Sequence, residues 1–337
     1  MAPRMNQPVL AAQDLEVEYE RSGARVRSLD SATLTLDPGQ IVALVGESGS
    51  GKSTLAMAAG RTLSANARYV GGSLEVGGGV PVLSCSAAEL RRLRRRVLGL
   101  IFQNPIAALD PTMRIERQLN LASRYAAPSE SAAAALASVG LHDVPRVLRA
   151  FPHELSGGMA QRVAIAMALR QHPDLLIADE PTAAIDATLR EEILRLHVDR
   201  CKSPGCALLL LTHDLHAVAR FTDRIAVMYA GRVVETGQTR AVLANPIHPY
   251  TRALIGSVSG TEKPGERLSA IGGLPPVLLG PSSGCAFAPR CPNAIEICTD
   301  HRPSLAAAAL DGTRTACCHL TADPHRDDQS ATRMEDE

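Results

Sequence analysis

The sequence predicts an α/β protein built on a mainly parallel sheet, with an antiparallel β section, an all-helical insert and a cysteine-containing tail. An apolar run at residues 41–45 leads directly into a glycine-rich loop and a helix start at residues 46–54. Apolar runs then alternate with helical stretches between residues 175 and 229, which is typical of parallel strands covered on both faces. Five of the 8 cysteines follow residue 284, which marks the tail as distinct in composition.

The first segment predicts antiparallel strands. Residues 9–36 read as two strands joined at a turn near Ser22 and Gly23. A second strand-rich piece, with glycine turns at residues 71–72 and 77–79, continues to about Val82.

The glycine-rich loop after the run at residues 41–45 predicts a P-loop. Its glycines let the backbone curl so that successive N–H groups face phosphate oxygens, and the following helix adds the positive end of its dipole. A chance glycine-rich turn is the alternative, but the strand before, the helix after and the filled motif positions disfavour it. Lys52 supplies a cation for the β- and γ-phosphates, and the Ser53 hydroxyl is placed to ligate Mg²⁺. The predicted triphosphate site consists of Gly46, Glu47, Ser48, Gly49, Ser50, Gly51, Lys52, Ser53 and Thr54.

A second phosphate-binding helix start is predicted at residues 155–159. Ser156 is the expected N-cap, and Gly157 and Gly158 leave backbone N–H groups uncovered before an amphipathic run at residues 163–169. A self-contained kinase or GTPase needs only one such helix end. The second is therefore expected to complete a nucleotide pocket on another molecule.

Two carboxylates end the buried strand predicted at residues 175–178. Asp179 is placed to hold the Mg²⁺ shell, and Glu180 to polarise an attacking water. The pair predicts hydrolysis of the bound triphosphate.

Together, the segments at residues 46–54, 155–159 and 175–181 resemble the ATPase subunits of ABC transporters. Residues 155–159 correspond to the signature motif and residues 175–181 to the Walker B segment of that family. The resemblance implies the ABC ATPase fold, ATP and Mg²⁺ as cofactors, and transport-coupled ATP hydrolysis. It also implies that Ser156, Gly157 and Gly158 act in trans, on ATP bound to an opposing subunit.

The resemblance gives roles to four residues that are weak signals alone. Gln103 matches the Q-loop glutamine that touches Mg²⁺, and His213 matches the switch histidine that contacts the γ-phosphate. Asp186 matches the D-loop aspartate, which also acts in trans. Tyr19 matches the aromatic residue that stacks on adenine, although simple strand packing is the alternative for it.

Two positions depart from the family pattern. Ala160 follows the signature motif where relatives usually carry a larger polar residue, and Ile185 replaces the usual Leu before Asp186. Ile for Leu nearly conserves volume, and neither change removes a group that handles phosphate, metal or water. The site is therefore expected to be catalytically competent.

Residues 245–254 indicate a subgroup within the ABC ATPases. They resemble a segment shared by the ATPase subunits of dipeptide, oligopeptide and nickel importers, and residues 102–113 look like the Q-loop region of that group. The resemblance implies an ATPase that energises import, with di- or oligopeptides expected as the solute and nickel or another small solute as the alternative. An exporter ATPase is disfavoured by this segment. A soluble ABC ATPase acting on DNA or ribosomes is disfavoured because the sequence shows neither a long coiled coil nor a repeated ATPase half.

The same resemblance implies partners and a location. The partners are a second ABC ATPase subunit forming a heterodimer, two transmembrane permease subunits and an extracytoplasmic solute-binding protein, but no nucleic acid. The expected location is the cytoplasmic face of the inner membrane, as a peripheral protein. The predicted domains are an ABC ATPase domain at residues 1–260, with its helical subdomain at about 106–155, and a tail at residues 261–337.

Composition agrees with these expectations. The chain is 45% apolar, yet it has no apolar run near the ~20 residues that span a bilayer. Residues 1–10 lack the features of a signal peptide. Lys+Arg and Asp+Glu each number 35, so no global basic field favours nucleic acid. The arginine-rich run at residues 91–96 is expected to be a solvated helix face.

The tail cysteines allow three interpretations. In a reducing compartment a disulfide framework is disfavoured, so clustered thiols indicate a [4Fe–4S] cluster, a structural zinc site or free thiols. The spacing is not the tight pattern of zinc ribbons, and some relatives with cysteines so placed are associated with a [4Fe–4S] cluster. By resemblance the ligands are Cys285, Cys291, Cys298 and Cys318, with Cys317 spare. Such a cluster is expected to lie remote from the P-loop.

Overall fold

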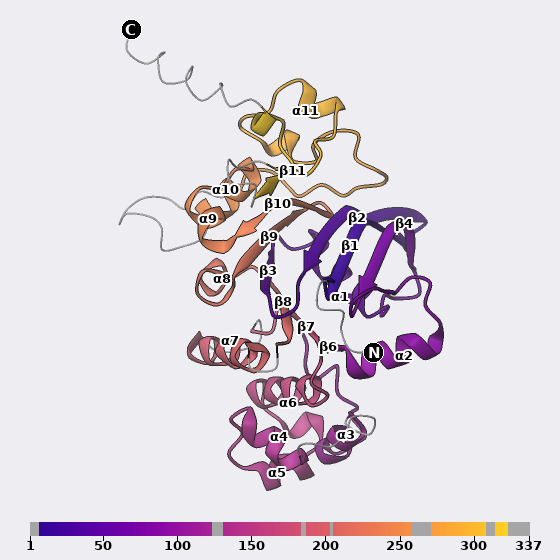
Figure 1. Ribbon diagram of the computed structural model, residues 1–337, viewed down its shortest axis with the longest axis vertical. Helices are drawn as coiled ribbons and strands as arrows, with labels where there is room; N and C mark the ends of the chain where they lie inside the picture. Colours follow the sequence, from indigo (N-terminus) through magenta and orange to yellow (C-terminus); the bar gives the residue numbers. More distant parts are fainter. Residues whose placement is uncertain are drawn as a thin grey trace.

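The computed structural model describes residues 7–122, 131–182, 187–202, 205–257, 271–307 and 314–322. Within these residues the longer strands form two sheets, one antiparallel and one mostly parallel, with helices packed around them (Figure 1). The α/β architecture predicted from the sequence is confirmed, including its antiparallel section and its helical insert.

The antiparallel sheet has the order β2-β1-β4-β5 among the described residues. Its first hairpin turns at Ser22 and Gly23, whose φ angles are 51° and 78°. Two left-handed residues make a turn whose twist matches that of the flanking strands, so this dipeptide closes the hairpin tightly. The strands are β1 (Leu10–Arg21), β2 (Ala24–Leu36), β4 (Ala67–Val76) and β5 (Val80–Pro81).

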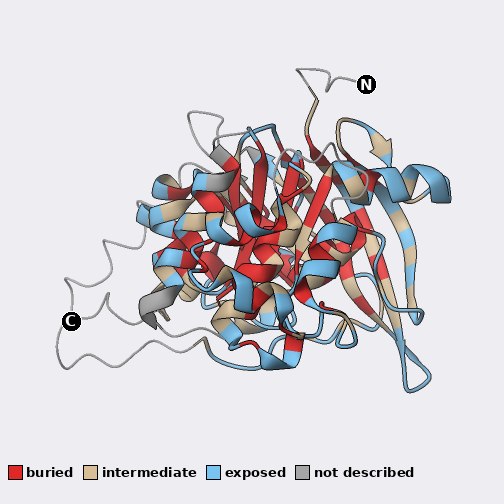
Figure 2. Cartoon of the chain, turned by 90° about the horizontal axis from the view of Figure 1, so that it is seen from below, coloured by how far each residue is buried: buried red, intermediate tan, exposed pale blue. Residues whose placement is uncertain are grey.

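The second sheet has the order β11-β12-β10-β9-β3-β8-β7-β6 in the part of the chain that is described. Strands β9, β3, β8, β7 and β6 are parallel, so their carboxyl ends meet at one edge. Every residue of β3, β7 and β8 is buried, as expected for parallel strands covered on both faces. Figure 2 shows the buried residues gathered in the strands at the centre of the molecule. The parallel strands are β3 (Ile41–Val45), β6 (Leu98–Ile101), β7 (Leu175–Asp179), β8 (Ala207–Thr212) and β9 (Arg224–Tyr229).

The helical insert forms a group of its own at the end of the molecule opposite the tail (Figure 1). It consists of α3 (Ile115–Ala122), α4 (Ala132–Ser138) and α5 (Val144–Arg149), which pack on one another, and α6 (Gly157–Leu169). Helix α6 also contacts β6 and α7 (Ala187–Lys202), so it links this group to the mixed sheet.

The remaining helices cover the sheets. Helix α1 (Lys52–Ala59) follows β3, and α2 (Ala87–Arg96) carries the arginine run, most of which is exposed as expected. No helix among the described residues is both long and apolar enough to cross a membrane. The others are α8 (Leu215–Phe221), α9 (Thr239–Ala244) and α10 (Pro249–Gly256).

The tail joins the mixed sheet, which the sequence did not predict. Strand β10 (Arg232–Gln238) pairs antiparallel with β12 (Thr315–Ala316), which pairs with β11 (Ala306–Ala307). The predicted domain boundary at residue 260 lies outside the described residues. The tail also contains the short helices η2 (Ala288–Arg290), α11 (Ile297–Asp300) and η3 (His319–Ala322).

Candidate functional site

The loop between β3 and α1 has the backbone shape of a phosphate-binding loop. A Cβ at Gly46 would lie 2.1 Å from the carbonyl oxygen of Met228, and one at Gly51 would lie 2.6 Å from that of Ser28. Gly51 also has a φ of 106°, so only glycine fits these two positions without strain. No described side chain caps α1 at Gly51. The N–H groups of its first turn can therefore bind an anion.

Lys52 is buried within this loop. Its Nζ donates to the carbonyl oxygens of Gly46 at 2.8 Å and Glu47 at 2.9 Å. Burial lowers the pKa of Lys52, while the carboxylates of Glu180, Asp179 and Glu47 raise it in the opposite direction. The lysine cation is thus held at the loop and faces the two carboxylates that end β7.

Asp179 and Ser53 fit a Mg²⁺ site. Oδ1 of Asp179 is buried and has no hydrogen-bond partner among the described residues. Burial raises the pKa of Asp179, and a hydrogen bond from the Ser53 side chain lowers it in part. A buried carboxylate oxygen without a donor, beside a hydroxyl, is the donor set that a hard cation prefers.

Glu180 follows Asp179 in an unusual backbone conformation. Its φ is 46°, and its N–H donates to the carbonyl oxygen of Leu211 on β8 at 2.9 Å. A left-handed non-glycine residue is strained and persists where the surrounding structure fixes it. This turn places Oε2 of Glu180 3.0 Å from Nδ1 of His213, which follows β8. The structure therefore brings these two predicted catalytic residues together.

The second predicted helix start has the expected cap. The Ser156 side chain accepts the N–H of Met159 at 3.3 Å at the start of α6. Ser156 and Gly157 are exposed, and a Cβ at Gly158 would meet no described atom within 4 Å. This helix end is thus open to another molecule.

No hydrogen bond or ion pair links Gln103 or Tyr19 to the P-loop among the described residues. Gln103 is exposed just after β6, beside Phe102, which is 38% exposed. Tyr19 is half-buried on β1 and packs on the core between the two sheets, so its role at adenine remains a prediction. Asp186 lies outside the described residues.

The tail contacts the P-loop directly, which the sequence did not predict. Arg290 donates from Nη1 and Nη2 to the carboxylate oxygens of Glu47 at 2.8 and 3.0 Å. The hydroxyl of Tyr250 accepts the N–H of Glu47 at 2.8 Å. Arg290 and Tyr250 follow Glu47 by 243 and 203 residues. No local sequence signal could have paired residues so far apart, so neither contact was predicted.

The four predicted cysteine ligands line one cavity in the tail. They are Cys285, Cys291, Cys298 and Cys318, whereas the Cys317 thiol donates to the carbonyl oxygen of Val233. Burial raises the pKa of three of them, Cys285, Cys291 and Cys318, and neighbouring thiols raise it further. Nevertheless, no group of three or more His, Cys, Asp or Glu among the described residues is arranged to hold a metal ion. The described residues therefore form no ready-made site for the expected iron–sulfur centre, although the four thiols that line one cavity match its ligand set.

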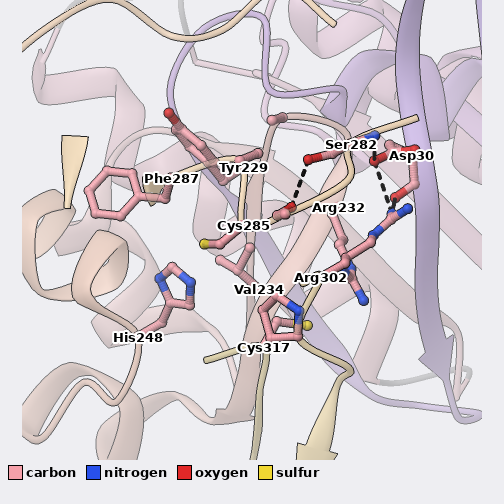
Figure 3. A pocket seen from close by; sticks show the side chains of 14 residues that line it. Asp30, Tyr229, Arg232, Val234, His248, Ser282, Cys285, Phe287, Arg302 and Cys317 are labelled. Carbon is pink, nitrogen blue, oxygen red and sulfur yellow. Dashed lines mark hydrogen bonds and ion pairs between the residues drawn. The ribbon is translucent and has the colours of Figure 1, made fainter. Parts of the chain in front are cut away.

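A neighbouring pocket shows how the tail docks on the sheets (Figure 3). On one side, Tyr229, Phe287 and His248 pack together, with Tyr229 and Phe287 ring centroids 5.3 Å apart. On the other, Nη2 of Arg302 lies 2.9 Å from Oδ2 of Asp30 on β2. Both contacts attach the tail to the sheets, one to β9 and the other to β2.

His248 is a buried neutral group in this region. Its Nδ1 accepts the N–H of Tyr250 at 3.0 Å and so caps α10. Burial lowers the pKa of His248 to about 4. The backbone N–H of His248 donates to the fully buried carboxylate of Glu235, which also pairs with Arg314 at 2.9 Å.

Known proteins resemble the chain along most of its length. The sequence profile described as "ABC transporter" matches residues 29–183, and "Oligopeptide/dipeptide transporter, C-terminal region" matches residues 234–298. The oligopeptide transport ATP-binding protein OppD of Escherichia coli (strain K12) is 39% identical over 311 residues, covering 90% of this chain and 91% of the relative. The dipeptide transport ATP-binding protein DppD of Bacillus subtilis (strain 168) is 39% identical over 296 residues, covering 86% and 88%.

A solved structure is similar as well. A dimeric ATP-binding cassette in a post-hydrolysis state, bound to ADP and Pi, matches with a TM-score of 0.61 at 26% identity. The match covers 68% of this chain and 99% of that one.

Proposed function

The chain belongs to the ABC transporter family and hydrolyses ATP, and on this premise we propose that it energises the import of di- and oligopeptides. The observation that carries the proposal is the match of residues 234–298 to the C-terminal region of oligopeptide and dipeptide transporters. The relatives named for oligopeptide and dipeptide transport, which match about nine-tenths of the chain, support the same solute class.

We assign the chemistry to residues at the carboxyl edge of the parallel sheet. Water attacks the γ-phosphorus of ATP as the bond to the ADP oxygen breaks, and Glu180 orients and polarises that water. Lys52 and the N–H groups of the P-loop neutralise charge on the phosphates, and His213 is held by Glu180 for contact with the γ-phosphate. Ser53 and Asp179, with Gln103, would hold Mg²⁺, which would supply further charge neutralisation at the phosphates.

The exposed start of α6 supports a site shared between two ATPase subunits. Ser156, Gly157 and Gly158 would contact ATP bound to the opposing subunit, together with Asp186. The proposed partners are a second ATPase subunit in a heterodimer, two transmembrane permease subunits and an extracytoplasmic binding protein, without nucleic acid. The chain would then act as a peripheral protein on the cytoplasmic face of the inner membrane.

The four thiols on one cavity support a [4Fe–4S] cluster as a further cofactor, with Cys285, Cys291, Cys298 and Cys318 as ligands. In the tail a cluster would cross-link the short helices η2 and α11 and the loops beside them. Its expected role is structural or redox-sensing, since none of the four thiols belongs to the residues that handle ATP.

Uptake in cells that lack the chain tests the proposed solute. Loss of labelled di- and tripeptide uptake, restored by the wild-type chain but not by Glu180→Gln, is the expected result. Unchanged peptide uptake with loss of ⁶³Ni²⁺ uptake would replace peptide import by nickel import. Loss of neither would overturn an importer function for these solutes.

A further inference from the structure

We propose that Arg290 is a positioning residue for ATP binding. Its ion pair with Glu47 holds the P-loop in place. The inference rests on ATP binding by the P-loop and does not depend on which solute is imported. It gives the tail a direct part in nucleotide affinity.

Glu47 is held at three points. Its carboxylate accepts both terminal nitrogens of Arg290, and its N–H donates to the Tyr250 hydroxyl. Its carbonyl oxygen accepts Nζ of Lys52 at 2.9 Å. Arg290 of the tail and Tyr250 of α10 thus fix the residue whose carbonyl oxygen holds the phosphate-binding lysine.

The guanidinium of Arg290 is also fixed by contacts other than those to Glu47. Nε donates to the carbonyl oxygen of Gly272 at 2.7 Å, and Nη1 donates to the Tyr229 hydroxyl at 3.3 Å. The Arg290 side chain is only 5% exposed, compared with 23% for Glu47. The arginine guanidinium is always protonated in proteins, so both hydrogen bonds to Glu47 are charge-assisted. A buried, two-pronged pair of this kind sets position and orientation together.

A rigid support lies beneath the ion pair. Arg290 ends the single turn of η2, and its N–H donates to the carbonyl oxygen of Phe287 at 2.9 Å. The guanidinium carbon lies 5.8 Å from the ring centroid of Tyr229 and 6.0 Å from that of Phe287. Tyr229 and Tyr250 pack with ring centroids 4.5 Å apart. The ion pair of Arg290 with Glu47, called the clamp below, therefore packs against buried aromatic rings. These contacts restrict the Arg290 side chain, unlike a free surface side chain.

This geometry predicts which kinetic constant depends on Arg290. A loop that is already ordered loses less conformational entropy when the triphosphate binds, so the clamp favours binding. The groups that act on water, Glu180 and His213, follow other strands and make no contact with Arg290. Loss of the clamp should therefore weaken ATP binding and leave the hydrolytic step nearly intact.

The test compares four variants of the full chain, measured in the assembled transporter. Arg290→Gln and Glu47→Gln should each raise the ATP dissociation constant and KM by about tenfold, with kcat changed less than about threefold. Arg290→Lys keeps one charged contact and should fall in between. The double variant should be no weaker than either single variant, because both remove the same contact.

Arg302→Gln is the matched control. It removes a second tail arginine, whose ion pair is to Asp30 on β2 and not to the P-loop. Its thermal midpoint should fall about as far as that of Arg290→Gln, with ATP affinity unchanged. Equal loss of ATP affinity in both variants, or additive effects of Arg290→Gln and Glu47→Gln, would show that the pair only stabilises the fold and would overturn the proposal.

Discussion

Nδ1 of His213 lies 3.0 Å from Oε2 of Glu180, so the residues that follow two neighbouring strands, β7 and β8, meet at one edge of the sheet. The Glu180 side chain is largely buried, whereas that of His213 is 70% exposed. The fold therefore fixes Glu180. The exposed His213 can contact a bound molecule while its ring stays within hydrogen-bond distance of Glu180.

Glu180→Gln should retain ATP binding and lose turnover by about 10²–10⁴-fold, because the amide cannot act as a general base. The substitution keeps the shape of the side chain, so the backbone turn at φ 46° should survive. The measurement is phosphate release alongside equilibrium ATP binding. Turnover near the wild-type rate would exclude Glu180 as the residue that polarises water.

Lys52→Ala, unlike Glu180→Gln, should weaken ATP binding itself. Removal of the buried cation deletes charged hydrogen bonds to phosphate, which should weaken ATP binding about ten- to a hundredfold. Isothermal titration with Mg·ATP measures the change. Unaltered affinity would mean that the phosphates do not lie at this loop.

Ser156→Arg should block ATP-driven pairing of the two ATPase subunits while the isolated subunit still binds ATP. The new side chain would fill the open space at the exposed start of α6. Ser86→Arg is the control, because Ser86 also caps an exposed helix start but lies on α2, away from the signature segment. Size-exclusion chromatography with ATP reports pairing. Pairing that survives Ser156→Arg, or is lost equally in both variants, would contradict a trans-acting role.

Stability should fall on acidification through His248. Burial lowers its pKa from 6.5 to about 4, so the unfolded chain takes up a proton between these values while the folded chain resists it. The contribution of neutral His248 to the free energy of unfolding is fully present above pH 6.5. It is lost as pH falls toward 4, at about 1.4 kcal/mol per pH unit in that window. His248→Asn keeps an N-cap acceptor and should flatten this slope, measured as urea midpoints from pH 7 to pH 4.5. The exposed His153→Gln should leave the slope unchanged. An identical slope in His248→Asn would contradict the assignment.

Protein purified without oxygen should contain about four irons per chain and absorb broadly near 400 nm if the tail thiols hold a cluster. Cys318→Ser should lose most of the iron, whereas Cys317→Ser should keep it, because that thiol points to Val233. Zinc without iron would replace the cluster by a zinc site. Four thiols that alkylate freely in native, metal-free protein would rule out both.

The sequence was sufficient where function depends on residues close along the chain. The strand, loop and helix around Lys52, the cap at Ser156 and the carboxylates ending β7 were all predicted, because each depends on local pattern. The clamp between Arg290 and Glu47 was not, since 243 residues separate its partners. Strands β11 and β12 contain two residues each, too few to show any periodicity.

The pairing of β12 with β10 has a practical consequence for anyone who shortens the chain. Cutting before the tail would uncover the backbone edge of β10 and leave the buried carboxylate of Glu235 without Arg314. Unpaired strand edges recruit strands from other molecules, and an uncompensated buried charge loosens the fold that would protect that edge. A minimal ATPase made in this way should be prone to aggregation. The tail is therefore expected to keep the protein soluble by covering the edge of β10.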